Sequence, residues 1–275
     1  MKKQTFSISF EDEGRLFDVL ARKLGVSKKR AQALIDAKQV LVNGKRIWIR
    51  RHLLKEDDVV EVIDWERRID PPKHLRTLWS DADYLVAEKP PYVIVNAAKG
   101  SLEERLREQE KNPAILAVHR LDKETSGCVL FARSPEAKKA MIPLFRGHDV
   151  IKVYRAVVIG SFPRKWTEIH SDLDGYVATT LVKVLDGNKH ASYLELRIET
   201  GRTHQIRRHL ADKRHPVLGD KQYAGVGNET SLAQPRQMLH AHRLVFRHPR
   251  TGETVRATAP LPADFRRCLK ELKLR

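Results

Sequence analysis

The chain has 275 residues, of which 52 are lysine or arginine and 35 are aspartate or glutamate, so its formal net charge is +17. Such a charge favours a polyanionic partner, because phosphate contacts release counterions, although a merely solubilising basic surface is the alternative. Two distant cysteines exclude a disulfide framework, and without a signal peptide or an apolar run near the roughly 20 residues of a membrane span we expect a cytoplasmic protein.

The N-terminal residues predict a small unit of helices and short strands. Residues 5–10 alternate polar and apolar side chains, as a strand does, and residues 59–64 are a second β-rich run. Between them, one helix is predicted from Arg15 to the left-handed cap Gly25, and another begins after the N-cap Ser27. Asn43-Gly44 predicts a hairpin. The side chains expected to face inward are Leu16, Val19, Leu20, Leu24, Ala31, Leu34 and Ile35.

This unit is densely basic. Within residues 21–51 the single acid Asp36 stands against Arg22, Lys23, Lys28, Lys29, Arg30, Lys38, Lys45, Arg46, Arg50 and Arg51. Solvated helices usually mix the two signs, so the cluster indicates a surface that follows phosphates, with an ordinary basic face as the alternative. The candidate RNA-binding residues in it are Lys28, Lys29, Arg30, Lys45 and Arg46.

The order of these elements supports a family resemblance. Over about residues 14–64, R-L-F-D-V-L-A, S-K-K-R-A-Q-A-L-I and V-L-V-N-G-K resemble the ribosomal small-subunit protein four-like domain, also called the alpha-L RNA-binding domain. The resemblance implies RNA rather than DNA. Residues 65–77, which contain Pro71-Pro72, predict a linker. We therefore expect one domain over residues 1–70 and another over residues 71–275.

The larger domain is predicted to be α+β, with a mostly antiparallel sheet. Helical patterns near residues 135–146 and 203–212 interrupt many short β-rich runs. These runs are Y-L-V-A-E-K, Y-V-I-V, C-V-L-F-A, V-Y-R-A-V-V-I-G, T-T-L-V-K-V-L, Y-L-E-L-R-I-E and H-R-L-V-F-R-H.

A first candidate site is His119-Arg120-Leu121-Asp122-Lys123-Glu124-Thr125-Ser126-Gly127, a polar loop that enters the apolar strand 128–132. Loops on a rigid framework often carry catalytic groups. Taken alone, an aspartate in such a turn more often caps the local backbone.

A second candidate site is Thr200-Gly201-Arg202-Thr203-His204-Gln205-Ile206-Arg207-Arg208-His209-Leu210, where a strand leads through a glycine into a helix that Thr203 would cap. A helix start favours anions, and Arg202, Arg207 and Arg208 add positive charge. The alternative, with equal weight, is a basic helix that faces solvent and binds no anion.

Together the two stretches resemble the RluA-type family of pseudouridine synthases, over about residues 80–266. Further matching segments are Glu88-Lys89-Pro90, Lys152-Val153-Tyr154-Arg155-Ala156, His215-Pro216-Val217-Leu218-Gly219-Asp220, Leu239-His240-Ala241 and Ala259-Pro260-Leu261-Pro262. The chain departs from the family pattern at Glu88 and at Pro91-Tyr92.

The resemblance implies a role for each matched residue. Asp122 is the catalytic aspartate, Tyr154 stacks on the target base, and Arg207 pairs with the carboxylate. Arg120 fills the space of the extruded base, and Leu130 or Ile206 walls the pocket. An isomerisation needs no cofactor. An arginine keeps the carboxylate ionised, ideally through a bidentate contact. Whether Asp122 attacks the sugar or the ring, or a glycal forms, stays open.

Two rival functions remain. One is a non-catalytic RNA-binding protein, and the other is a hydrolase with a second working acid, Glu124 or Glu199. The histidines His204, His209, His215, His240 and His242 lack an accompanying cysteine or carboxylate cluster, so we expect no metal. The appended domain favours ribosomal RNA of the large subunit over transfer RNA by analogy, and we expect a monomer.

Overall fold

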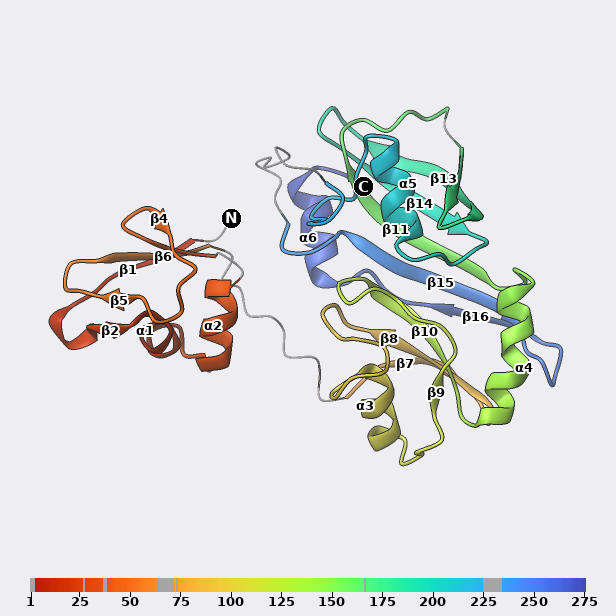
Figure 1. Cartoon of the computed structure of the whole chain (residues 1–275). Coiled ribbons are helices and arrows are strands. Elements are labelled where there is room, and N and C mark those ends of the chain that lie inside the picture. Colours follow the sequence, from red (N-terminus) through yellow and green to blue (C-terminus); the bar gives the residue numbers. More distant parts are fainter. Residues whose placement is uncertain are drawn as a thin grey trace. The chain divides into compact units, whose positions relative to one another are not determined.

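The computed structural model describes residues 3–26, 28–36, 39–63, 72, 74–165, 167–224 and 234–275. The chain divides into two compact units, Met1–Asp70 and Pro71–Arg275, and each has a hydrophobic core of its own (Figure 1). Ser27, Lys38 and most of the predicted linker lie outside the described residues. Among the described helices, none is long and apolar enough to cross a membrane.

The smaller unit packs two helices on a four-stranded sheet of order β1-β6-β3-β4 and also contains a β2-β5 ribbon. Helix α1 ends at Gly25 with φ 62°, the Asn43-Gly44 turn joins β3 to β4, and all seven expected inward-facing side chains are buried, so these predictions are confirmed. The elements are β1 Lys3–Ser7, η1 Phe10–Asp12, β2 Gly14–Arg15, α1 Leu16–Leu24, α2 Lys28–Asp36, β3 Val40–Val42, β4 Lys45–Arg46, β5 Leu53–Leu54 and β6 Val59–Ile63.

The strand expected at residues 5–10 is shorter at its C-terminal end than predicted. It ends at Ser7, because Ser7 pairs with Val59, the first residue of the partner strand β6. Ile8 is buried, and the chain then turns into the 3-10 helix that begins at Phe10.

The larger unit is built on a ten-stranded sheet of order β12-β13-β14-β11-β15-β10-β8-β7, with β16 on β15 and β9 on β10. All of its described pairings are antiparallel except that between β10 and β15, which lies near the middle. The predicted α+β class is confirmed. The strands are β7 Thr77–Ser80, β8 Tyr84–Lys89, β9 Leu116–Ala117, β10 Ser126–Ala132, β11 Ile151–Ile159, β12 Glu168–Leu173, β13 Tyr176–Gly187, β14 Ala191–Ile198, β15 Leu239–Arg247 and β16 Thr254–Thr258.

Helices cover both faces of this sheet. On one face, α3 (Leu102–Gln109) and α5 (Gln205–Asp212) share a core with Val129 and Phe131 of β10. On the other face lie α4 (Pro135–Arg146), which packs with Leu130, and α6 (Ala263–Glu271), which packs with Val157 of β11. Alternate side chains of a strand point to opposite faces, so a strand covered on both sides is buried along its whole length, as β10 is.

Three sequence-based assignments in the larger unit were incomplete or wrong. Residues 92–95 do not form a strand, because Pro90-Pro91 end β8 and Tyr92 adopts a positive φ of 69°. The predicted linker is too long, since Leu75 is buried and its amide donates to Gln109. Helices α3 and α6 were missed, although Ser101 and Glu104 have the spacing of a capping box and the Ser101 hydroxyl caps α3.

Candidate active site

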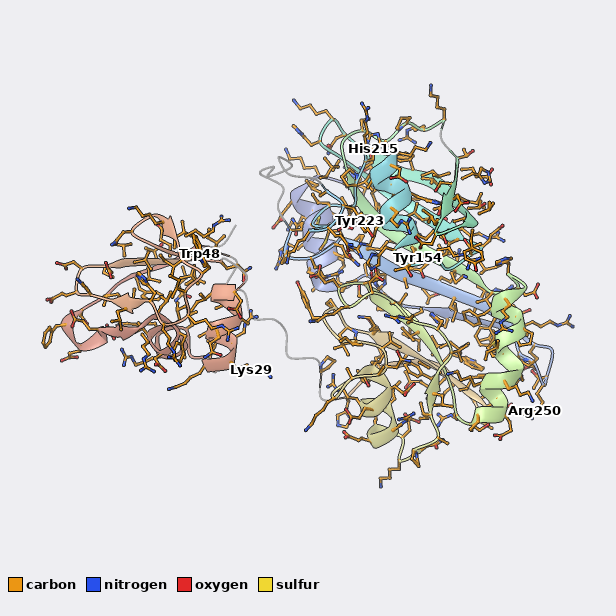
Figure 2. All side chains as sticks on the ribbon, in the orientation of Figure 1. Lys29, Trp48, Tyr154, His215, Tyr223 and Arg250 are labelled. Carbon is orange, nitrogen blue, oxygen red and sulfur yellow. The ribbon has the colours of Figure 1, made fainter. Side chains whose placement is uncertain are left out.

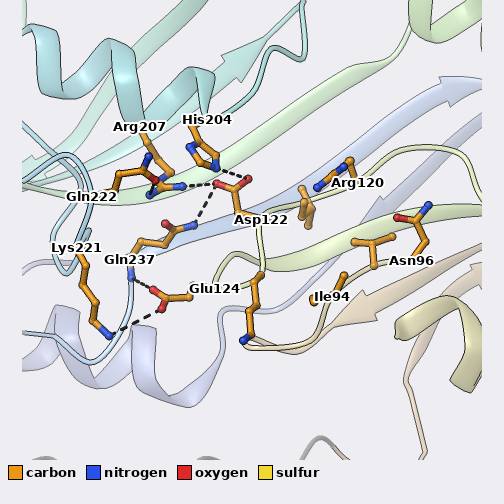
Figure 3. A pocket seen from close by; sticks show the side chains of 13 residues that line it. Ile94, Asn96, Arg120, Asp122, Glu124, His204, Arg207, Lys221, Gln222 and Gln237 are labelled. Carbon is orange, nitrogen blue, oxygen red and sulfur yellow. Dashed lines mark hydrogen bonds and ion pairs between the residues drawn. The ribbon is translucent and has the colours of Figure 1, made fainter. Parts of the chain in front are cut away.

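A cavity of about 450 Å³ lies in the larger unit, with residues of both candidate motifs in its wall (Figure 3). A second cavity of about 80 Å³ shares part of this wall. Asp122, Arg120, Leu121, His204 and Arg207 line both cavities. The folding of the sheet has therefore joined two stretches of chain that are some 85 residues apart.

The loop that carries Asp122 is fixed at its two ends. Upstream, His119 Nε2 accepts a hydrogen bond from the Leu130 backbone N–H at 3.0 Å. Burial lowers the pKa of His119 to about 3, so the ring is neutral and can act as this acceptor. Downstream, the fully buried Lys89 ammonium donates to the carbonyl of Lys123 at 2.9 Å. Burial, together with the charge of Arg236, lowers the pKa of Lys89 to about 7.

The loop then enters the sheet through a position that only glycine fits. Gly127 has φ 117°, and a Cβ atom there would lie 2.1 Å from the carbonyl oxygen of Ala241. The two backbones come this close because β10 pairs in parallel with β15 and Gly127 lies opposite Ala241. The site therefore lies where the two antiparallel parts of the sheet meet.

The Asp122 side chain points into the cavity rather than capping its own loop. Its Oδ2 atom accepts from Arg207 Nη1 at 2.9 Å and from Gln237 Nε2 at 3.5 Å. Its Oδ1 atom lies 3.6 Å from His204 Nε2 (Figure 3). Within the described part of the chain, no backbone N–H donates to this carboxylate. The interpretation of Asp122 as a local turn cap is therefore wrong, and Oδ1 accepts no hydrogen bond from the described residues.

Arg207 is shared between two carboxylates. Its bidentate contact is to the buried Asp220, with Nε–Oδ2 at 2.6 Å and Nη2–Oδ1 at 2.9 Å, while only Nη1 reaches Asp122. Burial by itself would lower the pKa of Arg207, but hydrogen bonds and charge from Asp220 and Asp122 outweigh it and raise that pKa. Burial would raise the pKa of Asp220, but Arg207 outweighs it and lowers that pKa. The bidentate contact expected for Asp122 thus belongs to Asp220.

The sequence patterns did not predict a site role for Asp220, Gln237 or His204. The Gln237 amide bonds Thr125 Oγ1 at 2.6 Å, so it is oriented next to Asp122. His204 adopts φ 54°, and its Nδ1 lies 3.0 Å from the hydroxyl of Tyr223. A left-handed conformation is costly for a side-chain-bearing residue and often marks a functional site. The signal that could have found Asp220 is an acid that directly follows the apolar run Pro216–Gly219.

Tyr154 lines the smaller cavity together with the apolar side chains of Ile206 and Leu239. It is 7% exposed, and its hydroxyl has no hydrogen-bond partner among the described residues. Burial raises the pKa of Tyr154, and the charge of Asp122 adds to the rise. Of the two residues expected to wall the pocket, Ile206 does so, whereas Leu130 packs on the opposite face of the sheet.

The start of α5 differs from the prediction. The N-cap is His204, not Thr203, and no side chain caps this end. Instead, the Gln205 side chain accepts from the Arg202 amide at 3.1 Å and from the Thr200 hydroxyl at 2.7 Å. Arg202 lines the smaller cavity, and its guanidinium carbon lies 4.2 Å from the Tyr176 ring centroid.

The basic cluster of the smaller unit is partly neutralised. Asp12 binds Arg22 and Lys23, Asp18 binds Lys28 at 2.6 Å, and Asp36 binds Arg50 at 2.6 Å. The count over residues 21–51 missed Asp12 and Asp18, because folding brings acids from outside that window. In the described ranges, Lys29, Lys45 and Arg46 are exposed and have no ion pair.

The rival second acids differ in position. Glu124 lines the larger cavity, and its carboxylate accepts a hydrogen bond from the backbone N–H of Gln237 at 3.4 Å, whereas Glu199 lines neither cavity. No group of three histidine, cysteine, aspartate or glutamate side chains in the described residues could hold a metal ion.

Comparisons with known proteins agree with both sequence resemblances. Residues 83–212 match the family model for RNA pseudouridylate synthase, and residues 14–60 match that for the S4 domain. The chain is 32% identical to "Ribosomal large subunit pseudouridine synthase D" of Xanthomonas campestris pv. campestris, covering 94% of this chain and 89% of that protein. It is 33% identical to the protein of the same description from Neisseria meningitidis serogroup A, covering 95% and 79%.

Solved structures share the fold of the larger unit. "Human RNA Pseudouridylate Synthase Domain Containing 1" has a TM-score of 0.59 at 25% identity and covers 73% of this chain and 90% of that chain. "Human RNA Pseudouridylate Synthase Domain Containing 4" has a TM-score of 0.61 at 23% identity and covers 72% and 93%.

Proposed function

The chain belongs to the RNA pseudouridylate synthase family, and we propose that it isomerises uridines of large-subunit ribosomal RNA with Asp122 as the catalytic carboxylate. The observation that carries the assignment of Asp122 is its 2.9 Å contact with Arg207 in the wall of the cavity. The ribosomal substrate is supported by the descriptions of the relatives and by the S4 domain. Transfer RNA is the alternative substrate.

The reaction balances without a redox cofactor or a group donor. The N1–C1′ bond of uridine breaks, uracil turns, and a C5–C1′ bond forms, while C5 loses a proton and N1 gains one. The reacting group is the Asp122 carboxylate, which Arg207 holds by its Oδ2 atom. Asp122 Oδ1, which Arg207 leaves open, is then the atom that attacks the sugar, attacks the ring, or takes a sugar proton to give a glycal.

The surrounding residues suit a base that must turn while bound. The base leaves its stack before the reaction, which costs a few kcal/mol. We assign Tyr154 to stacking on the uracil, because an aromatic face holds a ring without fixing its rotation. We assign the exposed Arg120, in the wall of both cavities, to the gap that the base leaves. Arg202 binds the adjoining phosphates.

The test is chemical mapping of pseudouridines in all cellular RNAs from cells that lack this gene. The cells are complemented with the wild-type gene, with Asp122→Asn, or with Glu199→Gln, a control acid that lines neither cavity. Wild type and Glu199→Gln should restore modification in large-subunit ribosomal RNA, and Asp122→Asn should not. Purified Asp122→Asn should lose more than about 1,000-fold in single-turnover rate while it still binds RNA.

Three other results of these experiments would each contradict a different part of the proposed function. Restored modification by Asp122→Asn would remove Asp122 from its role. Missing pseudouridines only in transfer RNA would overturn the substrate and leave the chemistry. Release of free uracil with an abasic RNA would favour the hydrolase, in which Glu124 would be the second acid.

A further inference from the structure

The smaller unit exposes an apolar surface that its own core does not use. Trp48 is 64% exposed, Ile49 59% and Leu53 65%. Figure 2 labels Trp48 on the smaller unit. Eight large hydrophobic side chains are exposed in the described part of the chain, and these three fall within six consecutive residues. Such clustering marks a contact surface more often than a chance exposure does.

The segment that carries this surface is held in place at several points. The Ile47 amide donates to Val40 at 2.9 Å, and the Leu16 amide donates to His52 at 2.7 Å. The His52 amide donates to the Ile49 carbonyl at 3.0 Å and so closes a turn. At the tip of that turn, Arg50 binds Asp36 through two hydrogen bonds, of 2.8 and 2.6 Å. The Trp48 side chain therefore projects from an ordered backbone, which lowers the entropic cost of binding.

The positive charge around this surface favours an anionic partner. Residues 37–55 contain no aspartate or glutamate, and Asp36 is occupied by Arg50. Lys45, Arg46 and Arg51 are exposed and, within the described ranges, without an ion pair. An aromatic side chain among unpaired cations fits a nucleotide, since the bases stack on the ring and the phosphates meet the charges.

We propose that Trp48 is a stacking platform for an unpaired base of the substrate RNA, with Ile49 and Leu53 at its apolar edge and Lys45, Arg46 and Arg51 on the flanking phosphates. The inference rests on RNA being the substrate, as proposed above. It adds that the smaller unit contacts a loop or a single-stranded segment in addition to the backbone of a duplex. In a duplex the bases are stacked on one another, so their faces are closed to a side chain.

The test uses the full chain in the Asp122→Asn background, so that no turnover occurs. The probes are a short single-stranded oligouridine and a fully paired RNA duplex of the same length. Trp48→Ala should weaken oligouridine binding by about 5-fold to 100-fold and duplex binding far less. Trp48→Phe should keep most of the affinity, because a smaller aromatic face remains. It should also abolish the quenching of tryptophan fluorescence by oligouridine.

The matched control is Phe10→Ala. Phe10 is 74% exposed in the same unit, but Glu11, Asp12 and Glu13 follow it, so acids rather than unpaired cations flank its ring in the sequence. This variant should bind both probes as the parent protein does. Unchanged oligouridine affinity in Trp48→Ala, or full quenching in Trp48→Phe, would overturn the platform while leaving the proposed function standing. A parent protein that binds neither probe would count against the proposed function itself.

Discussion

The buried guanidinium of Arg207 links two carboxylates whose environments differ. Asp220 is fully enclosed and takes the bidentate contact, while Asp122 is partly exposed and accepts one hydrogen bond from Arg207. Asp220 thus orients Arg207, and Arg207 donates from Nη1 to Asp122, the carboxylate that we propose to react. This arrangement leaves Asp122 Oδ1 without a hydrogen bond among the described residues, with His204 Nε2 at 3.6 Å, which suits the role that we propose for Asp122.

Asp220→Asn is expected to lower both the stability and the rate. Removing one partner of a buried ion pair leaves the other charge uncompensated, at a cost on the order of 3 kcal/mol. The pKa of Asp220 is lowered, so the pair stabilises the fold above pH 3.8 and this contribution is lost as the pH falls through the lowered pKa. Urea unfolding from neutral to acidic pH should show a shallower acid loss in Asp220→Asn.

The control for this variant is Asp174→Asn. Asp174 binds Arg208 at 2.9 Å but is 63% exposed, so its loss should change stability by less than about 1 kcal/mol. Equal effects of the two substitutions on stability and single-turnover rate would show that Asp220 does not position Arg207.

Tyr154→Phe should keep RNA binding and lower the single-turnover rate by only about 10-fold, the value of one hydrogen bond. Burial raises the pKa of the hydroxyl, so it is protonated at neutral pH and is suited to donate a hydrogen bond rather than to take the C5 proton. Tyr154→Ala should lose the stacking face as well. A loss of 100-fold or more in the Phe variant would show instead that the hydroxyl transfers a proton.

At the scale of secondary-structure elements, the parallel pairing of β10 with β15 determines where Asp122 lies. Gly127→Ala should unfold the larger unit or lower its melting temperature strongly, because the new Cβ would lie 2.1 Å from the Ala241 oxygen. Gly175→Ala is the matched control, since Gly175 has φ 81° and open space around its Cβ position. Its cost should be limited to backbone strain of about 1 kcal/mol. Thermal unfolding of the two variants separates the clash from the strain, and equal melting temperatures would contradict the close approach.

At the scale of the whole molecule, the two units have separate hydrophobic cores. Deleting residues 1–70 should leave a folded larger unit with its chemistry intact, because the described core residues of that unit all lie at Leu75 or later. Long RNA should bind more weakly, most of all at low salt. The slope of log affinity against log salt should become shallower by roughly 0.7–0.9 per lost phosphate contact.

Saturating RNA should restore most of the single-turnover rate of the truncated enzyme, since a tether raises effective concentration without changing the reacting groups. A salt series and a saturating single-turnover assay on both proteins measure this. An unchanged salt slope would show that the basic cluster does not touch RNA. A truncated enzyme that binds well but stays slow would show that the smaller unit helps to build the active complex.

The sequence by itself determined the α+β class, most of the strands and the two family resemblances. Those features depend on local order: the continuous apolar run of β8, the alternating apolar residues of β14, the Asn43-Gly44 turn, and motifs within short stretches of chain. Side-chain periodicity and turn chemistry are properties of neighbouring residues, and they can be read without knowing the fold.

Only the tertiary structure decided the partners of the charged groups. Asp220 takes the bidentate contact expected at Asp122, and Asp12 and Asp18 neutralise cations that appear unopposed in sequence. His204 also comes to lie next to Asp122 only after the α5 start and the Asp122 loop are brought together. The physical reason is that an ion pair depends on distance and burial in space, and the sheet brings together residues that the sequence holds far apart.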